Sequence, residues 1–207
     1  GEESVKIEAF YQVLGMALPV LCGMFCSMSS EQEAAAGAFQ SMLMVQKKYI
    51  PFLSKLILLL FWELGALLLV SALFGAGFTF ILGNHLVPIR FYFLVSVHLW
   101  GSSIVLYILH LFLAFQCRKG ISIGLGIVES LVSGLFLTDM GKYVWTYVPV
   151  SWPARIPTTF IQAYTGEIEA GVVLHEMLPV WGIFTALSMV CYVVWSSRWE
   201  KIKRAWV

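Results

Sequence analysis

Long apolar stretches alternate with short polar ones along the chain, and this pattern predicts a bundle of membrane-spanning helices. Five stretches approach or exceed the ~20 apolar residues that a helix needs to cross a bilayer. We place them at residues 10–28, 52–82, 91–115, 121–137 and 177–195. The predicted fold is therefore an all-α polytopic membrane protein with a single transmembrane domain over residues 1–207.

The polar segment after the first span has the features of a short amphipathic helix. Ser30 and Glu33 have the spacing of a capping box, and an alanine-rich run follows them. Phe39 and Leu43 then contribute to an apolar stripe. We predict a helix over residues 29–48, suited either to docking on a soluble protein or to lying on the membrane surface.

The segment before the last span, residues 138–176, is rich in aromatic residues and proline. Trp145, Tyr147 and Trp152 are of the kind that settles at the headgroup level of a membrane. We expect an extracellular aromatic loop that either caps the bundle or meets an amphipathic ligand.

The composition agrees with a membrane protein and limits the partners. The chain is 59% hydrophobic and 12% charged, which is about half the charged fraction of a soluble domain. Its mean hydropathy is +0.84. The net charge of +1 implies no nucleic-acid partner. The four cysteines have neither metal-site spacing nor a disulfide framework, so we expect them to be small packing residues.

The basic residues divide unevenly between the two membrane faces. One face would carry nine of them, namely Lys47, Lys48, Lys55, Arg118, Lys119, Arg198, Lys201, Lys203 and Arg204. The other would carry Lys6, Arg90, Lys142 and Arg155. The face with more Lys and Arg is normally cytoplasmic, so the C-terminus should lie inside and the first residues outside. We therefore expect one further span upstream, giving six spans with both ends inside.

Two carboxylates fall inside predicted spans, Glu63 in the second and Glu129 in the fourth. An ionisable side chain within a membrane is costly unless it is paired or hydrated, which makes each a candidate functional residue. They could line a polar path, pair across helices or relay protons. Alternatively, each is hydrogen-bonded to Ser or Thr on a neighbouring helix.

The fourth span also carries small residues at helical spacing. Gly126, Ser130 and Gly134 follow one another at intervals of four, and Gly124 lies one half-turn earlier. Small residues at this spacing let helix backbones approach closely in lipid. We predict a close-packing helix, either within the subunit or across a dimer interface.

Histidine-based sites have little support in the sequence. His98 and His110 lie on one span, about 18 Å apart along a helix axis. A haem held by two histidines would need a facing His on another span, but His85 falls in a turn and His175 at a span end. Position 179 is Pro, so the zincin-like start at His175 lacks its second ligand. The chain also has no Walker loop, so it cannot hydrolyse ATP by a P-loop mechanism.

Three segments together resemble a known family. Glu31-Gln32-Glu33, the Ala-Gly-Ala-Phe-Gln that follows and a lysine-rich step into the next span resemble ABC-2 type permeases. The glycine-studded run at 120–128 and the run at 144–155 sharpen the resemblance to permease subunits of lantibiotic immunity and resistance exporters. The resemblance extends from about residue 10 to the C-terminus.

The resemblance implies a six-span fold in the bacterial cytoplasmic membrane. Two permease subunits would pair and dock two copies of an ATPase, which would bind ATP and Mg, so this chain would be no enzyme and hold no cofactor. The complex would expel a lantibiotic peptide from the membrane. Residues 29–48 would correspond to the coupling helix, with contacts from Glu31, Glu33, Phe39, Gln40 and Leu43. The residues facing the peptide would be Trp145, Tyr147, Trp152 and Arg155.

Two other functional classes stay open on the sequence. One is a membrane-anchor or electron-transfer subunit that binds haem through His98 or His110. The other is a secondary transporter that couples to protons through Glu63 and Glu129.

Overall fold

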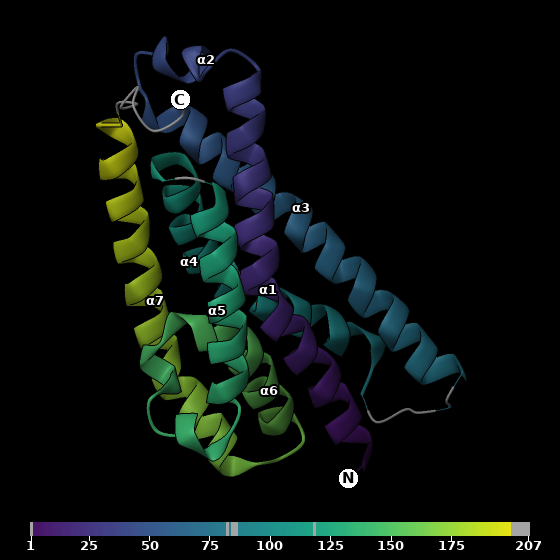
Figure 1. Cartoon of the computed structure of the whole chain (residues 1–207). Helices are drawn as coiled ribbons and strands as arrows, with labels where there is room; N and C mark the ends of the chain where they lie inside the picture. The colour runs from purple at the N-terminus through teal and green to yellow at the C-terminus, as the bar shows by residue number, and fades with distance from the viewer. Residues whose placement is uncertain (1, 82, 84–86, 118, 200–207) are drawn as a thin grey trace.

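The computed structural model describes residues 2–81, 83, 87–117 and 119–199, and every regular element within these ranges is helical (Figure 1). The long helices are α1 (Glu2–Ala35), α3 (Tyr49–Ala76), α4 (Ile89–Gln116), α5 (Lys119–Phe136) and α7 (Ile168–Ser197). The shorter ones are α2 (Gln40–Leu43), the π-helical turn η1 (Gly77–Ile81), the 3-10 turns η2 (Asp139–Gly141), η3 (Trp145–Tyr147) and η4 (Pro149–Ser151), and α6 (Trp152–Tyr164).

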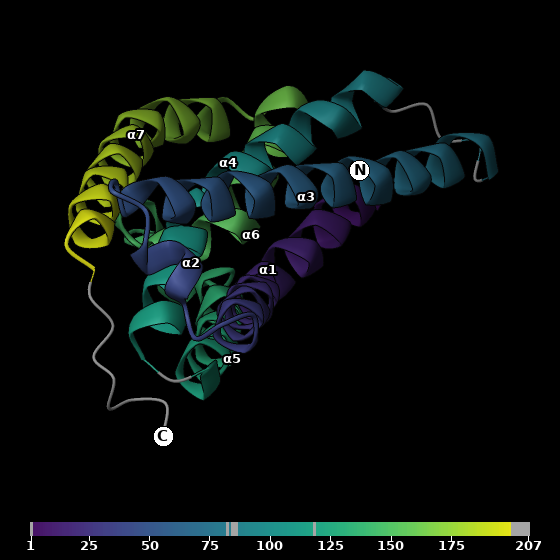
Figure 2. The same ribbon diagram turned by 90° about the horizontal axis from the view of Figure 1, so that it is seen from above.

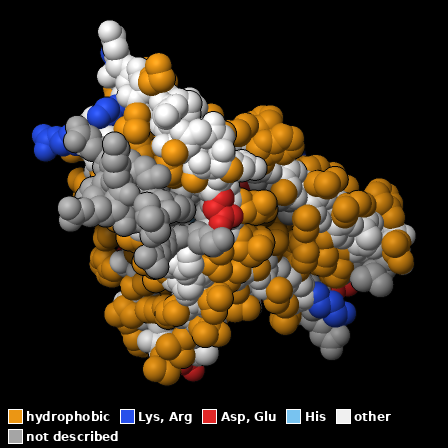
Figure 3. Space-filling view, turned by 45° about the horizontal axis from the view of Figure 1, so that its top comes forward, with side chains coloured by type: hydrophobic (Ala, Val, Ile, Leu, Met, Phe, Trp, Pro, Cys, Tyr) orange, Lys and Arg blue, Asp and Glu red, His pale blue; other side chains and the backbone are white. Residues whose placement is uncertain are grey.

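Within the described residues, four helices are long and apolar enough to cross a membrane, namely α1, α3 with η1, α4 and α7. The prediction of a helical, multi-pass membrane protein is thereby confirmed as far as helix content and apolar length are concerned. The fifth predicted span, 121–137, corresponds to α5, which has 18 residues and is shorter than the ~20 that usually cross a bilayer. Hydrophobic side chains cover much of the surface in view, as lipid contact requires (Figure 3).

Helix α1 is the central element of the bundle. It packs against α4, α5 and α6, whereas α3 packs mainly against α4 and makes little contact with α1. Seen from above, α1 and α5 are neighbours and α7 lies at the edge (Figure 2). We call the end at which α1 and α7 finish and α3 begins the α2 end; the chain starts at the opposite end (Figure 1).

Close approach of α1 and α5 depends on small residues in α5. A Cβ on Gly126 would lie 2.6 Å from the carbonyl oxygen of Pro19. One turn on, the hydroxyl of Ser130 donates to the Met16 carbonyl over 2.6 Å. A Cβ on Gly134 would approach the sulfur of Met16. These residues therefore form a packing face within the subunit.

Gly124 differs from the other small residues that were predicted to pack. A Cβ at this position would meet no described atom within 4 Å. It lies on the opposite side of α5 from the packing face, because two residues along a helix turn through about 200°.

The helix predicted over residues 29–48 does not form as one unit, and this prediction is wrong. Helix α1 continues through Ala35, and of the rest only Gln40–Leu43 is α-helical. Ser30 is no N-cap: it is fully buried within α1 and donates to the Ala114 carbonyl over 2.9 Å. The alanine-rich run favours extension of an existing helix, since propagation avoids the cost of a new nucleus.

The aromatic segment 138–176 is likewise not a loop. It folds into three 3-10 turns, helix α6 and the first turns of α7, all at the end opposite α2. Trp152 is fully buried and Trp145 is 4% exposed, so these side chains belong to the core. The indole nitrogen of Trp152 donates to the Thr146 carbonyl over 3.1 Å, which satisfies its one donor inside the fold.

The two groups of basic residues occupy opposite ends of the bundle. Lys47, Lys48, Lys55 and Arg198 belong to segments at the α2 end, where α5 also begins. Lys6, Arg90, Lys142 and Arg155 belong to segments at the other end. Arg118, Lys201, Lys203 and Arg204 lie outside the described residues, as do His85 and Leu82. Which end faces the cytoplasm stays a prediction.

The α1–α5 contact predicts a difference between two neighbouring glycines. Gly126→Val should lower the melting temperature in detergent, because the added side chain meets the α1 backbone; overpacking of this kind costs about 1–3 kcal/mol. Gly124→Val, which enters open space, is the matched control and should leave it nearly unchanged. Equal melting temperatures for the two variants would contradict the packing described here.

Candidate functional site

Glu63 is a buried carboxylate on the face of α3 that packs against α4. Its side chain is 7% exposed, and Ser103 of α4 places its hydroxyl oxygen 2.7 Å from Oε2. The other oxygen, Oε1, has no hydrogen-bond partner among the residues that the structure describes. Beside it, the indole nitrogen of Trp100 donates to the Leu60 carbonyl over 2.9 Å and ties α4 to α3.

Glu63 borders an apolar crevice between α1 and α3. The crevice encloses about 510 Å³ and is lined by Leu14, Leu18, Leu21 and Phe25 of α1, by Leu59, Trp62, Glu63, Ala66, Leu67 and Val70 of α3, and by Tyr107 of α4. Toward the end opposite α2, Phe10 and Phe74 stack with their ring centroids 3.9 Å apart and close the space between the two helices. The crevice thus has apolar walls and one carboxylate.

The second intramembrane carboxylate belongs to a different polar cluster. Oε2 of Glu129 on α5 lies 2.8 Å from Nε2 of His110 on α4. The other ring nitrogen of His110, Nδ1, lies 3.0 Å from the hydroxyl of Ser122 on α5. This hydroxyl also lies 3.4 Å from the carbonyl of Gly23 on α1. The cluster therefore joins three helices.

The Ser122–His110–Glu129 cluster has the connectivity of a nucleophile, base and orienting acid. However, Ser122 and His110 are both fully buried, so no substrate reaches the hydroxyl. Glu129 is 8% exposed, which keeps its carboxylate inside the bundle as well. The arrangement fits a positioning role, because it satisfies buried polar groups across α4 and α5.

The His110–Glu129 contact was not predicted, although the sequence contains a signal for it. The predicted spans 91–115 and 121–137 are joined by a tight turn and must be antiparallel neighbours. Ser122 and Glu129 are seven residues apart and share one face of a helix. Counting outward from the turn places His110 between them in depth, so the three residues could have been paired.

The chain reverses sharply between α1 and α3, in a turn that carries Phe39. Gly37, Ala38 and Phe39 have positive φ angles of 133°, 50° and 67°. For a bulky side chain such as that of Phe39 this conformation is strained, and it persists only where the surroundings hold it. Phe39 is fully buried, so the residues packed around its side chain maintain this backbone conformation.

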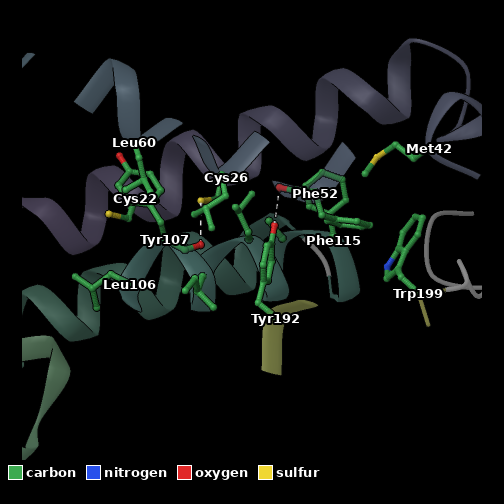
Figure 4. Packing of buried hydrophobic residues seen from close by; sticks show 14 of the residues in the cluster. Cys22, Cys26, Met42, Phe52, Leu60, Leu106, Tyr107, Phe115, Tyr192 and Trp199 are labelled. Carbon is green, nitrogen blue, oxygen red and sulfur yellow. Dashed lines mark hydrogen bonds between the residues drawn. The ribbon is translucent and has the colours of Figure 1, made fainter. Parts of the chain in front are cut away.

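An aromatic cluster at the α2 end receives the Phe39 ring. The ring centroid of Phe39 lies 5.9 Å from that of Phe115 on α4 and 5.8 Å from that of Trp199, which follows α7. Phe52 of α3 joins the same cluster, 5.1 Å from Phe115, and its carbonyl accepts a hydrogen bond from Tyr192 of α7 (Figure 4). The turn is thereby fixed to α3, α4 and α7 at once.

The five residues predicted to contact an ATPase therefore lie in different surroundings. Phe39 is buried and cannot serve as a contact surface, contrary to expectation. The Glu33 carboxylate is engaged within the chain. It forms an ion pair with Lys55 over 2.6 Å and accepts a hydrogen bond from Ser41 over 3.0 Å. Glu31 is partly exposed on the last turns of α1.

The short stretch that follows Phe39 is an exposed part of the segment. Gln40 is exposed and Leu43 is 38% exposed, as a contact surface requires. The next two residues extend the apolar surface, because Met44 is 84% and Val45 38% exposed. We call residues 40–47 the α2 tip.

The residues predicted to face a peptide are also divided by the structure. Trp145 and Trp152 are core side chains, so the prediction is wrong for them. Arg155 donates from Nε to the Phe136 carbonyl over 2.7 Å and from its terminal nitrogen to the Thr138 carbonyl over 3.1 Å, which satisfies carbonyls at the end of α5. Tyr147 alone of the four is well exposed, at 63%.

The geometry gives no support to a metal or haem site in the described part of the chain. No group of three or more His, Cys, Asp or Glu side chains is placed there to hold a metal ion. Both ring nitrogens of His110 are engaged, and His98 bonds its own helix at Leu94 while stacking on Phe160. Comparison of the chain with protein-family models, with curated proteins and with solved structures finds no match.

The two histidines of α4 form a matched pair for testing the buried cluster. His110→Ala should lower the melting temperature in detergent more than His98→Ala, because it leaves Glu129 and Ser122 without their buried partner. Leaving a buried polar group unpaired costs about 1–3 kcal/mol. Glu129→Gln keeps an acceptor for the ring and should cost less than His110→Ala. Similar losses of melting temperature for His98→Ala and His110→Ala would show that the Ser122–His110–Glu129 cluster does not stabilise the fold.

Proposed function

We propose that this chain is the permease subunit of an ATP-driven exporter that expels lantibiotic-type peptides from the bacterial cytoplasmic membrane. ATP would be hydrolysed on a separate ATPase, present in two copies, and a second permease subunit would complete the pore. In this arrangement the α2 end faces the cytoplasm, in keeping with Lys47, Lys48 and Lys55 at that end. The sequence resemblance suggests the function, and one structural feature supports it.

The supporting feature is the α2 tip. Leu43, Met44 and Val45 expose apolar side chains among polar and basic residues at the polar end of the bundle. Apolar groups in water are stabilised when a partner surface covers them, and exposed apolar patches with a polar rim are typical of protein interaction sites. The tip is therefore suited to seat in a groove of a soluble ATPase.

The anchoring of the tip indicates how force would pass into the membrane. The tip begins directly after Phe39, whose ring contacts those of Phe115 and Trp199. Phe52 of α3 contacts the same two rings. Close-packed interiors transmit displacement instead of absorbing it. A partner that moves the tip would therefore displace α3 relative to α1, since these two helices share few contacts.

A second candidate function is proton-coupled transport, which the two intramembrane carboxylates favour. Glu63 and Glu129 are buried in separate clusters within the bundle. Transport that stops without ATP but persists without a proton gradient would exclude this candidate. Dependence on the gradient alone would exclude the exporter.

The exporter predicts that the α2 tip is needed to recruit the ATPase. Met44→Asp combined with Leu43→Asp should abolish co-purification of the ATPase from cells expressing the chain with its genomic neighbours, and should sensitise those cells to the lantibiotic. The charged side chains cannot be buried without a large desolvation cost. Mass spectrometry of the purified complex and a growth assay measure the two effects.

Ile168→Asp is the control for this experiment. Ile168 is as exposed as Met44, at 85% against 84%, and lies at the opposite end in the first turn of α7, where a negative charge suits the helix dipole. The control should retain the ATPase. Retention of the ATPase by the tip variant as well would overturn the proposed coupling, and absence of any ATPase from the wild-type complex would overturn the proposed function.

A further inference from the structure

The crevice between α1 and α3 contains a polar atom that the fold leaves unused. Glu63 is more than nine-tenths buried, and its Oε1 has no partner among the described residues. A buried carboxylate oxygen without a hydrogen bond is strongly unfavourable in an apolar environment. An apolar or amide side chain at this position would fill the same space at lower cost, so packing alone does not account for Glu63.

The shape of the crevice indicates that it receives a ligand from the membrane. Its volume of about 510 Å³ falls in the range of ligand pockets, ~300–1,000 Å³. The lining is almost wholly apolar, and Trp62 is 67% exposed at its edge. Both α1 and α3 are long enough to span a membrane, and the exposed side chains of Phe25 and Trp62 lie in the crevice lining, so the opening would face lipid in the single chain.

The depth of Glu63 restricts what can reach it. Glu63 lies 14 residues after Tyr49, the first residue of α3, and therefore about 21 Å along the helix. This is well inside the ~30 Å hydrocarbon core if α3 begins near the interface. The partner of Oε1 must therefore be carried on an apolar body that enters the membrane.

A carboxylate in such surroundings selects a cation that donates hydrogen bonds. An ammonium group pairs with a carboxylate through short, charge-assisted bonds, and the pair as a whole is neutral, which lowers the cost of burial. Glu63 is the one charged residue among those that line the crevice, so no basic side chain of the described lining competes for it. Anionic headgroups are disfavoured for the same reason.

We propose that the α1–α3 crevice binds the ammonium-bearing apolar portion of an amphiphile, with Glu63 as its counter-ion and Ser103 holding the carboxylate in place. The ligand is either an amine-bearing lipid or the lysine-bearing part of an amphipathic peptide. In the second case the inference rests on the proposed exporter and names the site at which the peptide is held. Binding itself requires no ATPase.

The test uses the purified chain in nanodiscs made of phosphatidylcholine, which has no primary amine. Binding of radiolabelled dodecylamine, which is an ammonium at pH 7, is compared with binding of dodecanol after subtraction of empty nanodiscs. The wild-type chain should prefer the ammonium by at least about tenfold, as expected of a charge-assisted contact. Glu63→Gln, which can still accept from Ser103, should remove this preference and leave dodecanol binding unchanged.

Two further variants separate binding from folding. Ala66→Trp fills the crevice while Glu63 itself is unchanged, and should reduce binding of both probes. Glu169→Gln removes an exposed carboxylate outside the crevice, and should leave the preference intact. The proposal is overturned if the wild-type chain shows no preference for the ammonium, or if Glu63→Gln retains it. The melting temperature of each variant shows whether it is folded.

Competition identifies the source of the ligand. Displacement of dodecylamine by phosphatidylethanolamine mixed into the nanodisc would assign the site to a lipid, and displacement by a lysine-bearing lantibiotic would assign it to the peptide. If neither competes, the site takes no natural amine-bearing amphiphile and the proposal fails. These outcomes are distinct from failure of the exporter, which is measured by ATPase co-purification.

Discussion

The bundle depends on how helix α1 satisfies polar groups where no water is present. Hydrocarbon offers no hydrogen bonds, so each polar group within the membrane needs a partner in the protein. Tyr11 of α1 donates to the Tyr92 carbonyl on α4 over 3.0 Å, Ser30 donates to the Ala114 carbonyl, and Ser130 of α5 donates back to the Met16 carbonyl. These bonds require close backbones, which the small residues of α5 allow. Between the Glu33–Lys55 ion pair near one end and the Phe10–Phe74 stack near the other, α1 and α3 make few contacts and a crevice remains.

The two carboxylates show what this constraint means for function. Glu129 is bonded to His110, and that cluster is closed to any ligand. Glu63 has one oxygen bonded to Ser103 and the other unpartnered within the described residues, at the side of the crevice. Glu63 and Glu129 both fall inside predicted spans, and the sequence alone does not distinguish them. In the structure their surroundings differ. Glu63 is the better candidate for a functional residue, because its Oε1 makes no hydrogen bond that would stabilise the fold.

Hydropathy was sufficient to predict a helical membrane protein with most of its helices in place, because apolar length is a property of the chain itself. The errors concern segments whose structure depends on contacts between distant residues. Ser30 has the spacing of a helix start, but it lies inside the continuous helix α1 and its hydroxyl donates to a carbonyl of α4. Trp152 is typical of a membrane interface, yet α6 and α7 bury it completely. Phe39 belongs to a turn that no local pattern indicates, since its positive φ is maintained by contacts with the rings of Phe115 on α4 and of Trp199 after α7. Side chains of these types serve equally well at a surface or in a core, and only the tertiary contacts decide between them.

Helix α3 connects the two features on which the proposals rest. Phe52, in its first turn, belongs to the aromatic cluster that anchors the α2 tip. Glu63 follows 11 residues later, about 16 Å along the same helix axis. A helix without proline between these points moves largely as a rigid body, so displacement of Phe52 carries Glu63 with it. Because Ser103 belongs to α4, a shift of α3 against α4 would also change the hydrogen bond that holds the carboxylate. In the proposed exporter, movement of the α2 tip by an ATPase would therefore alter both the width of the crevice and the position of the Glu63 carboxylate beside it. This would be a physical route, in the proposed exporter, by which ATP use on one side of the membrane changes ligand affinity within it.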